Sequence, residues 1–225
     1  MNDTSDFACR ELTSKELFAR YSRRFVVISA AVAITCGLLV ISSRILGSRG
    51  IGFFSPDWLL MRSNTALCLI LCGSILCVSL NSINSITTPP FLTVHPALVL
   101  SSIPALISGL AFSEFLFNWS LGIDALLVLG LINAGQHALQ LQMETETAVC
   151  LLFLSISLGL NNLPQINRAT VISSSILCLA LIAVAISSFC SHFTPVLSHL
   201  TWLGNLVMSA DTAVLLILLG IASLL

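Results

Sequence analysis

Charged side chains are rare within the long apolar stretches of this sequence, so each of them is a candidate for function. Arg44 and Glu114 lie near the ends of two such stretches, where they could form an ion pair between helices. Making or breaking that pair would bias the helix positions, as in a switch. The alternative is that Arg44 reaches lipid headgroups and that Glu114 is solvated at the interface. We expect Asp124 to cap a short helix, with a ligand contact as the alternative.

The histidines offer a second chemistry, a haem or metal site. Haem ligation needs two imidazoles that face each other from different helices. His192 and His199 are seven residues apart, but Pro195 between them argues against one continuous helix. His137 is expected at the same membrane surface, and His95 at the opposite surface without a histidine partner. We favour interfacial histidines with no cofactor or metal, and keep haem-linked electron transfer as an alternative.

Three tryptophans, Trp58, Trp119 and Trp202, fall between the apolar stretches, as an aromatic belt predicts. With Glu114 they are expected to ring a cavity at the outer surface. Stacking on an aromatic ligand is a secondary possibility for this cavity. The sequence has no Gly-rich phosphate loop, no paired acids in an aqueous cleft, and no Cys-His or Ser-His pair in a catalytic context. We therefore expect no enzymatic activity.

The composition identifies the environment in which these residues act. Only 8% of the 225 residues are charged, against about 25% in soluble domains. Hydrophobic residues make up 56%, and the mean hydropathy is +1.02, values expected of an integral membrane protein. A formal net charge of −1 without a basic patch argues against a nucleic-acid partner. Most cysteines lie inside apolar runs as small hydrophobic residues, so we expect no disulfide.

A bilayer core of about 30 Å requires roughly 20 apolar residues in a helix. Six segments fit this requirement and predict an all-α bundle of about six transmembrane helices: residues 25–46, 64–80, 97–117, 143–160, 169–189 and 208–225. Residues 125–132 form a seventh apolar stretch that is too short to cross, and we expect an interfacial or re-entrant helix there.

The basic residues predict the orientation of the chain. Five of the nine precede the first span, and the positive-inside rule holds such a flank in the cytoplasm. Six spans then return the C-terminus to the cytoplasm. We therefore predict a cytoplasmic segment at 1–24 and a membrane-embedded domain at 25–225. The spacing of Thr13 and Glu16 is that of a capping box and predicts a short helix ahead of the first span.

A short word, Met-x-x-polar-Thr-Ala, recurs three times in the sequence. Its members are Met61, Asn64 and Thr65, then Met143, Glu146 and Thr147, and finally Met208, Asp211 and Thr212. Each copy opens an even-numbered span, and a small residue follows the threonine by eight positions, at Gly73, Ser155 and Gly220. The word therefore predicts three hairpin repeats, at 25–82, 97–160 and 169–225. Its polar residue and threonine are expected to accept hydrogen bonds from the first helical turn; helix-start chemistry without a repeat is the alternative.

Small residues recur at four-residue spacing in the first and third spans, a pattern that lets helices approach closely in lipid. They are Ser29, Ala33 and Gly37, and Ser101, Ala105 and Gly109. The sequence leaves open whether these stripes pack within the bundle or in a homodimer.

Residues 114–124, followed by the word at 143–148, resemble the hairpin unit in the N-terminal membrane domains of bacterial sensor histidine kinases and related diguanylate cyclases. Residues 62–73 resemble the first copy of that unit, and residues 211–220 the last. The family usually has proline before the Asn-Thr-Ala word, where this sequence has Ser63, and its inner loops are more basic than residues 81–96.

This resemblance implies a six-helix signal-input domain that works as a homodimer and relays a stimulus to a cytoplasmic output domain in cis. Because no output domain is present in the sequence, we expect the chain to be the membrane domain of a longer receptor. A small transporter or channel is the alternative from a different class, since Pro104 and the serines at 173–175 lie near the middle of predicted spans.

Overall fold

The structure, a computed structural model, describes residues 3–46, 62–84, 90–117, 143–163, 167–192 and 208–225, without the side chains of 3–14, 44–46, 81–84 and 90–95. The regular elements in these ranges are all α-helices: α1 (Asp3–Leu46), α2 (Ser63–Asn84), α3 (Pro90–Phe117), α5 (Thr145–Asn161), α6 (Arg168–Ser191) and α7 (Ala210–Leu224). The all-α class predicted from the sequence is confirmed.

Four of the described helices are long and apolar enough to cross a membrane. The qualifying stretches are Lys15–Ser43, Ser63–Leu80, Pro96–Phe117 and Arg168–Ser191. α5 and α7 are also apolar but shorter, with 17 and 15 residues. These lengths and compositions are compatible with a membrane protein, and the six crossings expected from the sequence stay a prediction.

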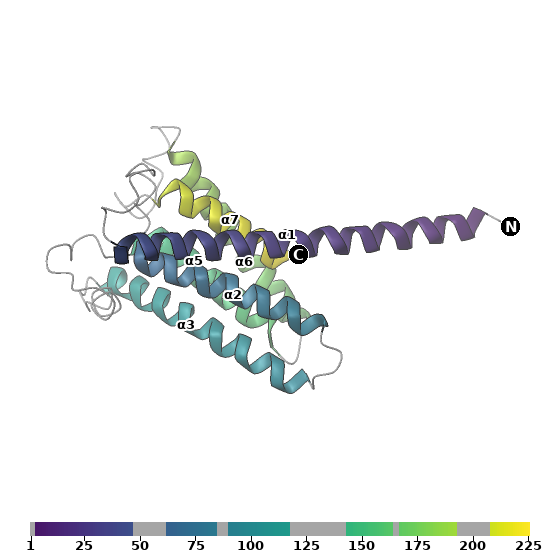
Figure 1. The fold of residues 1–225 in the computed structure, drawn as a ribbon, viewed down its shortest axis with the longest axis horizontal. Helices are drawn as coiled ribbons and strands as arrows, with labels where there is room; N and C mark the ends of the chain where they lie inside the picture. Colours follow the sequence, from purple (N-terminus) through teal and green to yellow (C-terminus); the bar gives the residue numbers. More distant parts are fainter. Residues whose placement is uncertain (1–2, 47–61, 85–89, 118–142, 164–166, 193–207) are drawn as a thin grey trace.

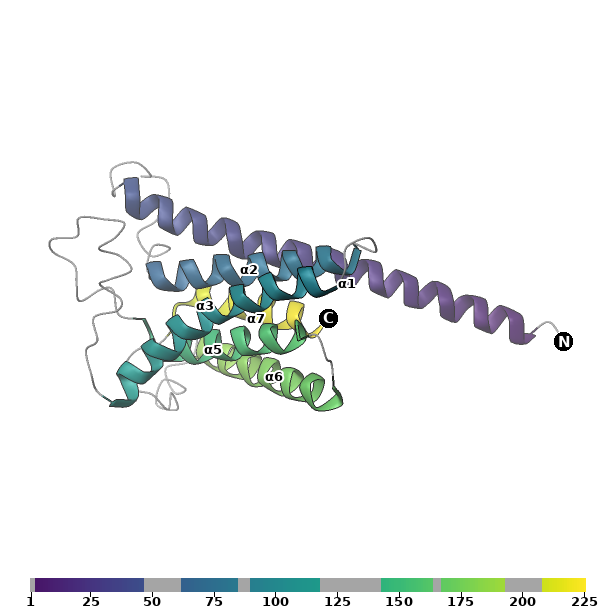
Figure 2. The same cartoon turned by 90° about the horizontal axis from the view of Figure 1, so that it is seen from below.

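The described helices alternate in direction and pack side by side (Figures 1 and 2). α1 contacts α2 and α7, α3 contacts α2 and α5, and α6 contacts α5 and α7. The helices α2, α5 and α7 also contact one another. They therefore form an inner group of three, around which α1, α3 and α6 are arranged.

The inner helices α2, α5 and α7 all begin at the same end of the bundle (Figures 1 and 2). The C-terminus lies at the opposite end, and the N-terminal part of α1 extends past that end (Figure 1). Residues from the first turn of each inner helix are thereby brought to one end.

Two predicted boundaries are corrected by the structure. α1 is continuous from Asp3 to Leu46, so Thr13 and Glu16 do not begin a helix. Residues 3–36 contain neither proline nor glycine, and nothing in the sequence interrupts helix propagation there. α2 continues to Asn84 and α3 starts at Pro90, inside the loop expected at 81–96. Proline is well suited to a first helical turn, because the missing N–H would have no partner there.

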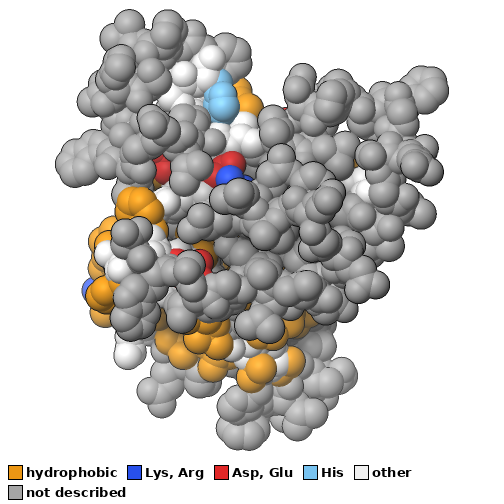
Figure 3. All heavy atoms as spheres, turned by 90° about the vertical axis from the view of Figure 1, so that its left-hand side faces the viewer, with side chains coloured by type: hydrophobic (Ala, Val, Ile, Leu, Met, Phe, Trp, Pro, Cys, Tyr) orange, Lys and Arg blue, Asp and Glu red, His pale blue; other side chains and the backbone are white. Residues whose placement is uncertain are grey.

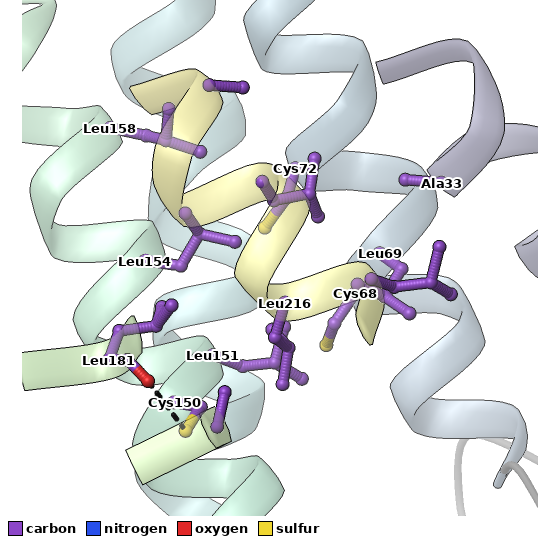
Figure 4. Packing of buried hydrophobic residues seen from close by; sticks show 14 of the residues in the cluster. Ala33, Cys68, Leu69, Cys72, Cys150, Leu151, Leu154, Leu158, Leu181 and Leu216 are labelled. Carbon is purple, nitrogen blue, oxygen red and sulfur yellow. Dashed lines mark hydrogen bonds between the residues drawn. The ribbon is translucent and has the colours of Figure 1, made fainter. Parts of the chain in front are cut away.

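The inner helices supply the most completely buried side chains of the apolar core, including Leu69 of α2, Leu151 of α5 and Leu216 of α7. Figure 4 shows these three side chains close together, with Cys68, Cys72 and Leu154 nearby. The outer helices instead expose large apolar side chains, such as Leu38 on α1 and Leu106 on α3. A helix with apolar residues on all sides is typical of a membrane span, because the outer face meets lipid.

Close helix contacts explain the small-residue stripes. A Cβ atom added at Gly37 would lie 2.8 Å from the carbonyl oxygen of Ala66, and one at Gly73 would lie 2.9 Å from that of Ala30. α1 and α2 therefore approach each other through glycine. On the second stripe, a Cβ at Gly109 would meet Leu152 of α5 at 3.7 Å. Both stripes thus pack against neighbouring helices of the same chain.

Candidate functional site: a polar cluster at the start of the inner helices

The three inner helices start at equivalent positions of the repeated word. The alanine that ends each word donates its backbone N–H to the residue four positions earlier: Ala66 to Arg62 (3.0 Å), Ala148 to Glu144 (2.9 Å) and Ala213 to Ser209 (3.0 Å). Polar and charged side chains gather at this end of the bundle. Figure 3 views the molecule from this end and shows acidic side chains beside a basic one. We name these residues the polar cluster: Arg62, Glu144, Glu146, Thr147, Ser188, Ser209 and Thr212.

The threonines of the words do not act as expected. The N-cap residues Glu144 and Ser209 both have extended backbones, but neither side chain accepts a hydrogen bond from a backbone N–H of the first turn. Instead, the Thr147 hydroxyl donates to Glu144 Oε2 at 3.2 Å, and the hydroxyls of Ser209 and Thr212 share a 2.7 Å hydrogen bond. The predicted capping is therefore wrong for α5 and α7: the threonine binds the side chain of the N-cap residue rather than offering an acceptor to the backbone.

Glu144 is the electrostatic centre of the polar cluster. Burial raises the pKa of its carboxyl above the ordinary value, and Glu146 raises it further. Attraction to Arg62 and hydrogen bonds from Thr147 and from the backbone of Ser209 favour the charged form and partly offset this rise. Glu144, which precedes α5, therefore interacts with residues at the starts of α2 and α7. The Nη1 atom of Arg62 is buried without a hydrogen-bond partner.

The outer helix α6 is joined to the same cluster. Glu146 in the first turn of α5 is only 6% exposed, and its Oε2 atom accepts a 2.8 Å hydrogen bond from Ser188. His192, which follows α6, has its Nε2 atom 2.7 Å from the carbonyl oxygen of Met208, just before α7. The end of α6 is thereby bonded to the starts of both α5 and α7.

Glu114 faces the interior of the bundle. It is 5% exposed and continues the buried face of α3 that includes Ser101 and Ser108, so the expectation of a solvated interfacial carboxylate is wrong. The register of α3 against α5 is given by two contacts: Gly109 lies beside Leu152, and Gly159 lies beside Ser101. This antiparallel register places Glu114 at the level of Glu146 and Thr147. The Oε1 atom of Glu114 is buried without a hydrogen-bond partner.

Several predicted residues fall where the structure gives no description. Arg44 lies in α1, but its side chain is not described, so the proposed ion pair with Glu114 stays a prediction. Outside the described residues lie Trp58, Met61, Trp119, Asp124, His137, His199 and Trp202. The outer cavity expected between Glu114 and the tryptophans therefore also stays a prediction. The remaining word residues are buried or partly buried: Asn64, Thr65, Met143, Met208, Asp211 and Thr212.

The described ranges contain cysteine, histidine and acidic side chains, the residue types that bind metal ions or form disulfides. These ranges hold no group of three or more His, Cys, Asp or Glu side chains that could bind a metal ion. Cys36, Cys72, Cys77, Cys150 and Cys178 are not in disulfides. The haem alternative stays a prediction, since only one of the four histidines, His192, has a described side chain.

Sequence reasoning missed four contributors to the polar cluster: Arg62, Glu144, Ser188 and Ser209. Arg62, Glu144 and Ser209 occupy the same position relative to their words, so the repeat spacing could have indicated them. Ser188 gives no such signal, because a serine among apolar residues on α6 resembles many others in the sequence.

A second polar group joins helices near the opposite end of the inner core. Ser157 of α5 is fully buried and lies 2.8 Å from the hydroxyl of Ser174 and 2.9 Å from Sγ of Cys178, both on α6. Its hydroxyl is also 3.3 Å from that of Ser223 on α7. Hydrogen bonds between these uncharged side chains therefore link α5, α6 and α7.

Comparison of the chain with protein-family models, with curated proteins and with solved structures found no match. The class that the fold defines is therefore a broad one: an all-α protein whose apolar helices suit a membrane.

Proposed function

We propose that this chain is the membrane-embedded signal-input module of a bacterial receptor of the sensor histidine kinase or diguanylate cyclase type. In this proposal a stimulus acts at the polar cluster and is relayed to an output domain in cis. The observation that carries the proposal is the position of α7. This helix starts at the polar cluster, where Ser209 interacts with Glu144, and it ends at the opposite end of the bundle.

Three two-helix repeats that cross the inner membrane with both termini in the cytoplasm are part of the same proposal. The repeat arrangement is supported by the helix contacts. Each inner helix packs against the helix that precedes it: α2 on α1, α5 on α3 and α7 on α6. Gly73 and Gly220 each follow the threonine of their word by eight positions, and both contact the outer helix of their own pair. Gly73 lies against Ile34, and Gly220 lies against Ile182.

The short inner helices are compatible with this arrangement. With 17 and 15 residues, α5 and α7 are about 26 Å and 23 Å long, less than a hydrocarbon core of about 30 Å. Because α1, α3 and α6 lie around them, polar groups at the ends of α5 and α7 can form hydrogen bonds with other protein groups and need not face lipid. The buried hydrogen bond between Ser188 and Glu146 and the partly buried one between His192 and Met208 are of this kind.

A relay needs an element that the stimulus biases between two arrangements. Glu144 provides such an element, since its charge is opposed by burial and favoured by Arg62 and the Ser209 N–H. Protonation of Glu144, or a ligand that competes for Arg62, would weaken the hydrogen bond to the start of α7. The last helix would then be released to shift relative to α5.

The test is a fusion of the full chain, through Leu225, to a histidine kinase reporter in bacterial cells. We expect Glu144→Gln to change reporter output at least severalfold, because the amide keeps the shape but not the charge. The matched control is Glu16→Gln, an exposed glutamate on the extended part of α1. Equal output from both variants and the parent, at equal protein levels, would contradict the proposal.

A proton-coupled transporter is the second candidate, and one observation favours it. Glu114 and Glu146 are both buried at the same depth of the bundle, and buried acids in membrane helices often mark ion or proton pathways. Purified protein in liposomes with a pH-sensitive dye distinguishes the candidates. Proton flux that is lost in Glu114→Gln would favour transport, whereas an absence of flux would favour the receptor.

A further inference from the structure

Three arginines and two aliphatic residues form a continuous stripe on α1, away from the polar cluster. Arg20, Arg23, Arg24, Val27 and Ile28 line a shallow hollow of about 410 Å³. Their spacing, with steps of three and four residues, places them on one helix face. All five are exposed, Val27 at 46% and Ile28 at 61%.

A second hollow of about 380 Å³ lies at the start of α6 and is lined by Asn167, Arg168, Val171 and Ile172. Its residues repeat the sequence of the first, because Arg-x-x-Val-Ile occurs at 24–28 and again at 168–172. The exposures also match, with Val171 at 49% and Ile172 at 58%. The same combination of one guanidinium and two branched aliphatic side chains is therefore presented on two outer helices.

Both hollows lie at the end of the bundle opposite the polar cluster. Among the described side chains of α1, which begin at Lys15, Val26 is the first buried apolar one, so Arg24 stands where this helix enters the bundle. Arg168 is the first residue of α6, which runs from that end toward the polar cluster. The arginines therefore lie at one membrane surface and the aliphatic residues lie deeper.

We propose that these two hollows bind anionic phospholipids of that leaflet. The guanidinium groups hold the headgroup phosphate, since arginine pairs with phosphate through several directed N–H donors. One acyl chain lies along the apolar face below. On α1 this face continues through exposed Leu38 and Leu39, and on α6 through Ile176 and Leu179. From Ile28 to Leu39 the face is about 17 Å long, close to half of a hydrocarbon core of about 30 Å.

A phospholipid fits these hollows better than a soluble phosphate compound. Each hollow is shallow and lined only by exposed residues, so a free anion would have to compete with water for exposed arginines. An acyl chain that packs on the aliphatic face keeps the headgroup beside the arginines. The α1 site, with three arginines against one on α6, should bind more tightly.

The experiment measures lipid binding to the full chain in neutral detergent by native mass spectrometry. We expect phosphatidylglycerol to bind more tightly than phosphatidylcholine. Each arginine near an anionic surface contributes about fivefold in affinity, so Arg24→Gln should weaken phosphatidylglycerol binding about fivefold. The triple change of Arg20, Arg23 and Arg24 to Gln should weaken it by about a hundredfold. Arg168→Gln should remove the weaker of the two bound lipids.

Lys15→Gln is the matched control, because it removes one positive charge from α1 on the other side of the helix. Nine residues separate it from Arg24, which is two and a half turns. Equal losses in Lys15→Gln and Arg24→Gln, or equal affinity of the parent protein for the two lipids, would overturn the proposal. Displacement of phosphatidylglycerol by soluble glycerol phosphate would also overturn it, since the site would then recognise a free phosphate. The proposal does not depend on the receptor function.

Discussion

Ser188 on α6 donates a 2.8 Å hydrogen bond to Glu146 in the first turn of α5. Both side chains are buried, at 1% and 6% exposure. A hydrogen bond to a carboxylate in a dry environment is stronger than one between neutral groups, and losing it leaves the carboxylate oxygen unsatisfied. This bond therefore fixes an outer helix against an inner one at the level of the polar cluster.

We predict that Ser188→Ala lowers the free energy of unfolding by about 1–2 kcal/mol. Hydrogen bonds to charged groups contribute about 1.5–3 kcal/mol in soluble proteins, and polar contacts between membrane helices average about 0.6 kcal/mol. The measurement is loss of helical circular dichroism during titration of mixed micelles with a denaturing detergent. Ser187→Ala is the control, because exposed Ser187 bonds only Val184 O of its own helix. Equal destabilisation by both variants would show that the Ser188 contact is unimportant.

Gly37→Ala should separate α1 from α2. The new Cβ would lie 2.8 Å from a backbone oxygen, which cannot move as freely as a side-chain tip. Overpacking of this kind costs about 1–3 kcal/mol, so the same titration should show a loss in that range. Gly109→Ala, where the Cβ would meet Leu152 at 3.7 Å, should be neutral or stabilising by up to about 1 kcal/mol because alanine favours helix. A neutral Gly37→Ala would mean that the two helices are not in close contact.

Ser157→Ala should loosen the packing of α5 with α6 and α7. The hydroxyl contacts polar side chains on both helices, and those buried groups would lose a partner together. We expect a loss of about 1–2 kcal/mol in the free energy of unfolding. Ser173→Ala is the matched control, since Ser173 is exposed on α6. Destabilisation of similar size in the two variants would contradict a specific role for the three-helix serine group.

Helix class and the starts of the inner helices could be predicted from the sequence, whereas packing faces could not. Hydropathy locates long apolar helices, and the words at Asn64, Glu146 and Asp211 fall in the first turns of α2, α5 and α7. In a soluble protein, hydrophobic periodicity would also indicate the buried face. Here the exposed Leu38 and the buried Leu69 are equally apolar, so the pattern carries little information about which side faces inward.

Side-chain hydrogen bonds were the least predictable part of the candidate site. The sequence indicates that Thr147 belongs to a helix start, but whether its hydroxyl meets the backbone or the side chain of Glu144 depends on local geometry. The partner of Glu146 is on α6, 42 positions away in sequence, and nothing in the spacing points to Ser188. The capping-box spacing of Thr13 and Glu16 also occurs inside a continuous helix, here α1, because no proline or glycine interrupts residues 3–36.

The raised pKa of Glu144 predicts how stability depends on pH. Because burial makes the carboxyl bind its proton more tightly in the folded protein than in the unfolded chain, its contribution is most favourable below the unfolded value of about 4.3. That contribution declines as the pH rises through the raised pKa and is constant above it. We therefore expect Glu144→Gln, which cannot ionise, to remove this part of the decline in melting temperature.

The measurement compares melting temperatures by circular dichroism between about pH 4 and pH 8, a range that brackets the titration of a carboxyl with a raised pKa. Relative to the parent, Glu144→Gln should gain stability as the pH increases, and Glu16→Gln should follow the parent curve. Arg62→Gln removes the attraction that favours the charged form, so the decline should move to higher pH. Parallel curves for Glu144→Gln and the parent would contradict this prediction, because they would mean that the pKa of Glu144 is the same in the folded and unfolded states.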